Sequence, residues 1–203
     1  ARYWFPCVDF PTVRSKMEYF LTADENLTIL ANGALVSEET KGGMKTSHWK
    51  LDYPCPSYLA CFAIGEFSVY EDKPLRDMPI AYFADKSYKP EQLQRTFEPT
   101  RKMLIWMEKK LGMDFPYPKY FQIAGREVGG AMENISLVSW DDKFILDKTM
   151  AKEWKYIMDL INVHEMSHSY FGDAVVSYDF AHVWLKESWA TYIESVWLED
   201  SEG

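Results

Sequence analysis

Hydrophobic and polar residues alternate over short distances in the first third of the chain, a pattern typical of β-strands. The alternating runs lie at residues 16–22, 27–30 and 47–51, and turn residues at 24–26, 32–33 and 42–43 separate them. The run at 58–67 is apolar almost throughout, which predicts a buried strand. Around residues 71–74 the composition becomes polar, so we expect residues 1–72 to belong to a β-rich domain.

After residue 72 the pattern changes to longer helical segments that alternate with short strands. We expect strands at 80–83, at 121–123 and after Gly130, and helices at 90–111, 151–171 and 181–197. Pro99 should interrupt the first helix, and Gly112 should end it. The face of the second helix that we expect to point inward carries Tyr156, Ile157, Leu160, Ile161 and His164. Residues 73–203 therefore predict a second domain, and the whole chain an α+β fold.

The composition is that of a globular protein without a basic surface. Hydrophobic residues make up 47% of the 203 residues and aromatic residues 16%, which supports a substantial core. The formal net charge of −9 argues against nucleic-acid binding, because phosphate contacts need Lys and Arg. A negative field instead attracts cations, including the ammonium group of a free peptide N-terminus.

Cysteine content and apolar run length bear on the compartment. Cys7, Cys55 and Cys61 have no metal-ligand spacing and an odd count, so we expect buried thiols rather than disulfides. No apolar run is long enough to span a membrane. The chain begins without a methionine or a signal-peptide pattern, so we expect a fragment of a longer protein. The compartment stays open, with the cytoplasm favoured.

Two histidines, His164 and His168, mark the chemistry of the second helix. Residues four apart on a helix differ by only about 40° in direction and about 6 Å along the axis, so both imidazoles can face one ion. Glu165 lies between them, where its carboxylate can reach a water on a metal without being a ligand. An H-E-x-x-H match alone also occurs by chance on solvated helix surfaces.

A third ligand is needed, because a catalytic zinc ion has three protein ligands and one open position. Glu187 is the candidate, since eighteen residues separate it from His168 and allow a second helix to return antiparallel to the first. Glu194 lies two turns further on nearly the same stripe, where it could bind the outer ring nitrogen of a histidine. Taken alone, a glutamate such as Glu194 is more often an exposed helix residue.

A glycine pair at residues 129–130 precedes a segment with strand character. An edge strand here could bind an extended peptide through its main chain, and Glu133 would then place a carboxylate beside that peptide. Taken alone, a glycine pair followed by a glutamate favours a simpler interpretation, a turn that enters a strand.

Together these residues resemble the aminopeptidase N family of gluzincin metallopeptidases. The resemblance rests on the G-A-M-E-N motif Gly130-Ala131-Met132-Glu133-Asn134, on His164-Glu165-x-x-His168 and on Glu187. Segments 1–7 and 111–120 are also similar to the family, so the resemblance spans the chain. It implies the later part of a saddle-like β domain over 1–72, followed by the first half of a thermolysin-like catalytic domain over 73–203.

Two positions depart from the family pattern. Lys186-Glu187-Ser188 stands where the family usually has Asn-Glu-Gly, and Asp173 stands where Asn is common. The resemblance also implies groups that this chain does not contain, among them a transition-state tyrosine beyond Gly203. Whether the fragment alone is active stays open, and the resemblance implies that its partner is the rest of its own polypeptide.

The resemblance implies a zinc aminopeptidase with one zinc ion per chain, held by His164, His168 and Glu187. Glu165 would serve as general base, and the segment Gly130–Asn134 would bind substrate, with Glu133 on the α-ammonium of a peptide with a free N-terminus. Three rival functions remain open: an epoxide hydrolase of the leukotriene type, an endopeptidase, and a non-catalytic family member that acts as an interaction module. The preferred side chain, the oligomeric state and the physiological substrate are open as well.

Overall fold

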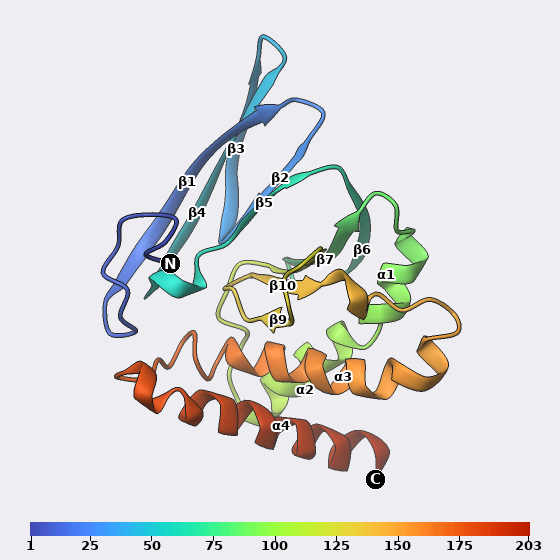
Figure 1. Cartoon of the computed structure of the whole chain (residues 1–203). Coiled ribbons are helices and arrows are strands. Elements are labelled where there is room, and N and C mark those ends of the chain that lie inside the picture. The colour runs from blue at the N-terminus through green and yellow to red at the C-terminus, as the bar shows by residue number, and fades with distance from the viewer.

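The first part of the chain folds into long antiparallel strands on one side of the molecule, as the computed structural model of residues 1–203 describes (Figure 1). A three-stranded sheet has the order β1-β4-β3, and its strands are β1 (Arg14–Asp24), β4 (Met44–Pro56) and β3 (Ala34–Lys41). A separate antiparallel pair joins β2 (Thr28–Ala31) to β5 (Phe62–Gly65). The β-rich character expected for this part of the chain is confirmed.

The buried strand predicted at 58–67 is wrong. A 3-10 turn at Ser57–Leu59 occupies its start, and β5 is a short strand that pairs with β2 alone. Phe62 and Ile64 are 41% and 37% exposed, because one face of this two-stranded pair is left uncovered. The expectation for the cysteines is only partly confirmed. All three are free thiols, but Cys55 alone is buried.

A five-stranded sheet forms the centre of the second part of the chain. Its order is β6-β7-β8-β10-β9, and its strands are β6 (Phe67–Leu75), β7 (Met78–Asp85), β8 (Tyr120–Gly125), β10 (Leu137–Asp141) and β9 (Ala131–Met132). The three middle strands run parallel, whereas β6 and β9 are antiparallel to their neighbours. The strand expected after Gly130 therefore exists and lies at an edge of the sheet. The expected boundary at residue 72 falls within β6, and the division into 1–72 and 73–203 stays a prediction.

Four helices pack on this sheet and on one another. They are α1 (Pro90–Phe97), α2 (Thr100–Leu111), α3 (Ala151–His168) and α4 (Trp184–Glu202). The interruption predicted at Pro99 separates α1 from α2, and Gly112 ends α2 with a φ of 67°. Figure 1 shows α3 lying between the sheet layer and α4. The catalytic motif predicted from the sequence therefore lies on the inner one of two stacked helices.

The inward face predicted for α3 is partly wrong. Tyr156 and Ile157 are 56% and 42% exposed, while the buried side includes Met158 and the polar residue Asn162. Asn162 can be buried because its amide nitrogen donates a hydrogen bond of 2.8 Å to the hydroxyl of Thr100. The true inward face therefore carries polar groups that a hydrophobic pattern does not count.

A buried polar cluster joins the two parts of the chain. We call Asn32, Gly33, Lys119 and Ser136 the interdomain cluster. Asn32 donates a hydrogen bond of 2.7 Å from its side-chain nitrogen to the carbonyl of Ile135. The backbone N–H of Gly33 donates to Ser136 Oγ over 2.7 Å, and Lys119 Nζ donates to the Gly33 carbonyl over 2.6 Å. The turn after β2 is thereby tied to the segment that directly follows Glu133 and Asn134.

Ser136 and Gly33 both have a positive φ. Ser136 has a φ of 60°, which is uncommon for a residue with a side chain. Gly33 has a φ of 82°, and a Cβ there would lie 2.0 Å from the carbonyl oxygen of Lys50. A glycine at position 33 therefore lets this turn lie against the backbone of β4. None of the helices has the length and apolar character needed to cross a lipid bilayer.

Candidate functional site

The last turns of α3 and the first turn of α4 bring together the three groups predicted to bind a metal. His164 and His168 lie on α3 with ring centroids 4.8 Å apart, and His168 is only 1% exposed. Glu187 Oε2 lies 3.3 Å from His164 Nε2 and 3.4 Å from His168 Nε2. One carboxylate oxygen therefore faces both inner ring nitrogens, and the structure assembles the expected triad.

The outer nitrogen of each histidine contacts an oxygen acceptor. His164 Nδ1 lies 2.6 Å from Glu194 Oε1, the contact expected from the sequence. His168 Nδ1 lies 3.0 Å from the carbonyl oxygen of Phe171, a partner that the sequence analysis did not identify. Acceptors on Nδ1 orient the rings so that both Nε2 atoms face the space beside Glu187.

This donor set fits a zinc ion. Two imidazole nitrogens and one carboxylate oxygen lie within 4.8 Å of one another, and this combination occurs in catalytic zinc sites. Hydrogen bonds from His164 and then from His168 hold the pKa of Glu187 well below its usual range. Glu187 is therefore present as the carboxylate that a metal requires.

Glu165 is buried beside this triad and has no partner for one of its oxygens. The residue is 6% exposed, and its Oε2 atom accepts no hydrogen bond. Oxygens of Glu165 and Glu133 and a ring nitrogen of His168 lie within 4.8 Å of one another. Burial raises the pKa of Glu165 to about 7. A carboxyl group with this pKa can take up and release a proton near neutral pH.

The predicted substrate segment forms the edge of the sheet next to the triad. Ala131 and Met132 pair with β10 on one side, while the other side of β9 has no neighbouring strand. Gly130 contributes its carbonyl to the N–H of Asp141. The side chain of Asn134 accepts a hydrogen bond of 2.8 Å from Ser139, so it fixes this segment within the protein.

Glu133 follows β9 and is 5% exposed. Its Oε1 atom accepts a hydrogen bond of 2.5 Å from the ammonium group of Lys186, which also contacts Glu187 Oε1. Lys186 is the side chain that the sequence analysis passed over, although its departure from the family pattern was a signal. The second departure, Asp173, is 2% exposed, and its burial raises its pKa well above the usual range.

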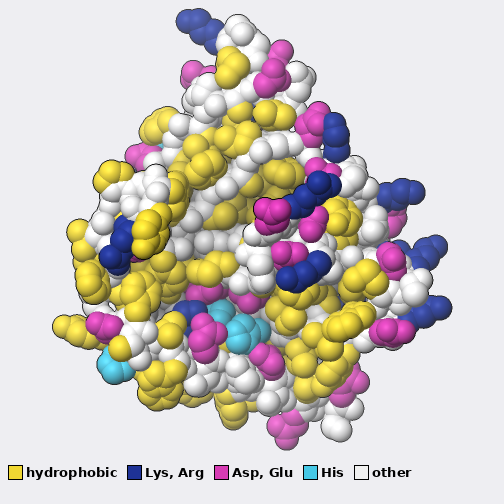
Figure 2. All heavy atoms as spheres, in the orientation of Figure 1, with side chains coloured by type: hydrophobic (Ala, Val, Ile, Leu, Met, Phe, Trp, Pro, Cys, Tyr) yellow, Lys and Arg dark blue, Asp and Glu magenta, His cyan; other side chains and the backbone are white.

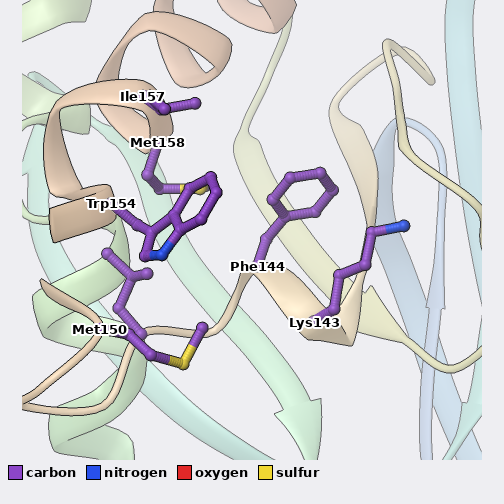
Figure 3. A pocket seen from close by; sticks show the side chains of 7 residues that line it. Lys143, Phe144, Met150, Trp154, Ile157 and Met158 are labelled. Carbon is purple, nitrogen blue, oxygen red and sulfur yellow. The ribbon is translucent and has the colours of Figure 1, made fainter.

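The surface around these groups is mixed in character. On the face shown in Figure 2, histidine and acidic side chains gather in the lower half, next to extensive hydrophobic surface. A different pocket of about 400 Å³ lies at the other end of α3 (Figure 3). Apart from Lys143, its lining is hydrophobic: Phe144, Leu146, Met150, Trp154, Ile157 and Met158. That pocket offers no acid, base or metal ligand, so we place the candidate chemistry at the triad.

Two protein-family models match this chain. A model described as the peptidase family M1 domain matches residues 95–203, and one described as the peptidase M1 N-terminal domain matches residues 1–59. The chain is 29% identical to aminopeptidase 2, mitochondrial, of Saccharomyces cerevisiae, over 95% of this chain and 20% of the relative. It is 29% identical to aminopeptidase N of Lactobacillus helveticus, over 100% of this chain and 24% of the relative.

A third relative is the puromycin-sensitive aminopeptidase of Caenorhabditis elegans, which is 28% identical over 98% of this chain and 21% of its own length. The chain thus spans about a fifth to a quarter of the length of these relatives.

Proposed function

The chain belongs to peptidase family M1, and from this premise we propose that the complete protein is a zinc aminopeptidase that removes the N-terminal residue of peptides. The chain comprises an M1 N-terminal domain and the start of an M1 catalytic domain. The observation that carries the proposal is the convergence of His164 Nε2 and His168 Nε2 on a single oxygen of Glu187.

His164, His168 and Glu187 hold the metal in this proposal. Zinc bound there would polarise the scissile carbonyl group and acidify the attacking water. Glu194 and the Phe171 carbonyl keep the two histidine rings oriented, because each contacts the ring nitrogen that faces away from the site.

Glu165 acts as the general base. Its unpartnered Oε2 atom accepts the proton of the water, and the resulting carboxyl group passes that proton to the amine that leaves. The pKa of about 7 supports this role, because the group changes its protonation state readily at neutral pH.

Glu133 and β9 position the substrate. The open edge of β9 offers main-chain groups to an extended peptide, and this binding does not depend on the peptide's side chains. Glu133 pairs with the α-ammonium group of the peptide. Because Glu133 lies at a fixed distance from the triad, only the first peptide bond can reach the attacking water.

The test uses the full-length protein, its metal content and a panel of aminoacyl substrates with free and blocked N-termini. We expect one zinc ion per chain and hydrolysis of the free substrates alone. Glu165→Gln should abolish turnover while zinc remains, and Glu133→Ala should raise KM for free substrates far more than for blocked ones.

Four outcomes would contradict the proposal. Turnover of Glu165→Gln close to the wild-type value would remove Glu165 from the role of base. Equal effects of Glu133→Ala on both kinds of substrate would remove Glu133 from the role of ammonium ligand. A protein without zinc or hydrolysis would be an interaction module, and one that opens lipid epoxides in place of peptides would be an epoxide hydrolase.

A further inference from the structure

The ammonium group of Lys186 is paired with the carboxylate of Glu133, which the proposed mechanism assigns to the α-ammonium group of the substrate. Its ammonium nitrogen lies 2.5 Å from Glu133 Oε1, and no other side chain donates a hydrogen bond to Glu133. Both residues are buried, with Lys186 9% and Glu133 5% exposed. A buried charge-assisted hydrogen bond of this length is a strong contact.

The surrounding backbone makes room for the lysine stem. A Cβ on Gly172 would lie 3.0 Å from Lys186 Cδ, so the stem packs against the backbone of a glycine. Gly172 has a φ of 134°, a conformation that side chains disfavour. The Lys186 ammonium is therefore held between Glu133 and Glu187 by its own packing as well as by charge.

We propose that Lys186 is a specificity-determining residue. It holds Glu133 in an internal ion pair and thereby weakens the binding of a peptide's α-ammonium group. The inference rests on the proposed role of Glu133 in binding that group. An α-ammonium and a lysine ammonium have the same charge and the same three donors, so they compete for one carboxylate. Where both are present, their like charges repel each other.

The consequence concerns substrate selection. With Lys186 in place, the protein should prefer peptides with a charged N-terminus less strongly than it would with an uncharged residue at position 186. An ammonium group is present in the peptide substrate and in the released amino acid alike. Lys186 therefore weakens the binding of both, which raises KM and lessens inhibition by product.

The experiment measures binding to the full-length zinc-loaded protein by calorimetry, with L-leucinamide as the free amine and N-acetyl-L-leucinamide as the blocked control. Every protein in the titrations, the one with Lys186 included, also carries Glu165→Gln, so that the ligand is not hydrolysed. Lys186→Asn removes the resident charge, and Lys186→Gln removes it while keeping most of the stem. Both variants should bind leucinamide about tenfold more tightly, because a buried carboxylate that has lost its partner gains a new one. Binding of the acetylated ligand should not change.

Two controls test whether the charge at this position is responsible. Lys186→Arg keeps a cation beside Glu133 and should behave like the wild type. Lys110→Asn removes one positive charge from an exposed pair with Asp200 and should also leave both affinities unchanged. In steady-state assays, Lys186→Asn should lower KM for free substrates and strengthen inhibition by L-leucine. Zinc content is measured in every variant.

The inference fails if neither neutral variant binds leucinamide more tightly than the wild type does. Such a failure overturns only the role of Lys186, and leaves the proposed function intact, if the wild type hydrolyses peptides and Glu133→Ala loses the preference for free amines. If leucinamide binds to neither the wild type nor the neutral variants, the proposed role of Glu133 and this inference fall together.

Discussion

The buried carboxyl group of Glu165 should lower the stability of the metal-free protein at neutral and alkaline pH. In the folded state the pKa of Glu165 is about 7, against 4.5 for a glutamate carboxyl group in an unfolded chain, and burial is the main cause. Below the unfolded value both states hold the proton. As the pH rises from 4.5 toward 7, the unfolded chain releases its proton first, so stability falls.

The size of the effect follows from the two pKa values. Each pH unit between them corresponds to about 1.4 kcal/mol, which gives a loss of about 3 kcal/mol once the pH exceeds both. Glu165→Gln keeps the shape of the side chain and removes its charge. We therefore expect this variant to match the wild type near pH 4.5 and to be more stable by about 3 kcal/mol near pH 8.

The assay is calorimetric unfolding of the full-length protein after zinc is removed with a chelator, over this pH range. Glu153→Gln is the control, because Glu153 lies exposed in the first turn of the same helix and loses the same charge. Its effect on the unfolding temperature should be nearly independent of pH. Parallel pH profiles for the wild type and Glu165→Gln would refute the reasoning, since they would show that Glu165 ionises normally in the folded state.

Two further predictions concern the histidine support and the interdomain cluster. Glu194→Gln should weaken zinc binding by about 10- to 100-fold, because Glu194 Oε1 lies 2.6 Å from His164 Nδ1; competition with a chelator measures this, and an unchanged affinity would make Glu194 a surface residue. Gly33→Ala should destabilise the protein by more than about 2 kcal/mol, because its Cβ would meet the Lys50 carbonyl oxygen at 2.0 Å. Gly43 has a similar φ of 80°, but a Cβ there would meet nothing within 4 Å, so Gly43→Ala should cost only about 1 kcal/mol of stability. Denaturant titration measures both variants, and equal losses would contradict the clash at Gly33.

The geometry of the triad was accessible from the sequence because it depends mostly on local structure. The helix period fixes the relation of His164 to His168, and the length of the connection to α4 limits where Glu187 can lie. The contact of Glu194 with a histidine follows from the same period. The roles assigned to these residues stay predictions.

Features that depend on long-range packing were not accessible. Lys186 meets Glu133 across 53 positions of sequence, and the packing of α4 against α3, which in turn contacts β9, brings them together. The error on the inward face of α3 has another origin, because hydrophobicity cannot show that Asn162 has a buried partner in Thr100. The strand predicted at 58–67 failed because an apolar run does not reveal how many of its faces will be covered.

The interdomain cluster has a consequence for how the molecule could be divided. The turn at Asn32 and Gly33 holds the chain at Ile135 and Ser136 by hydrogen bonds, shortly after Glu133, whereas α3 and α4 contain all three proposed metal ligands. Removing the residues that precede β6 would therefore leave the three proposed metal ligands in place but free the segment that carries Glu133. If Glu133 has the role proposed here, the shortened protein would cleave peptide bonds without selecting the first one.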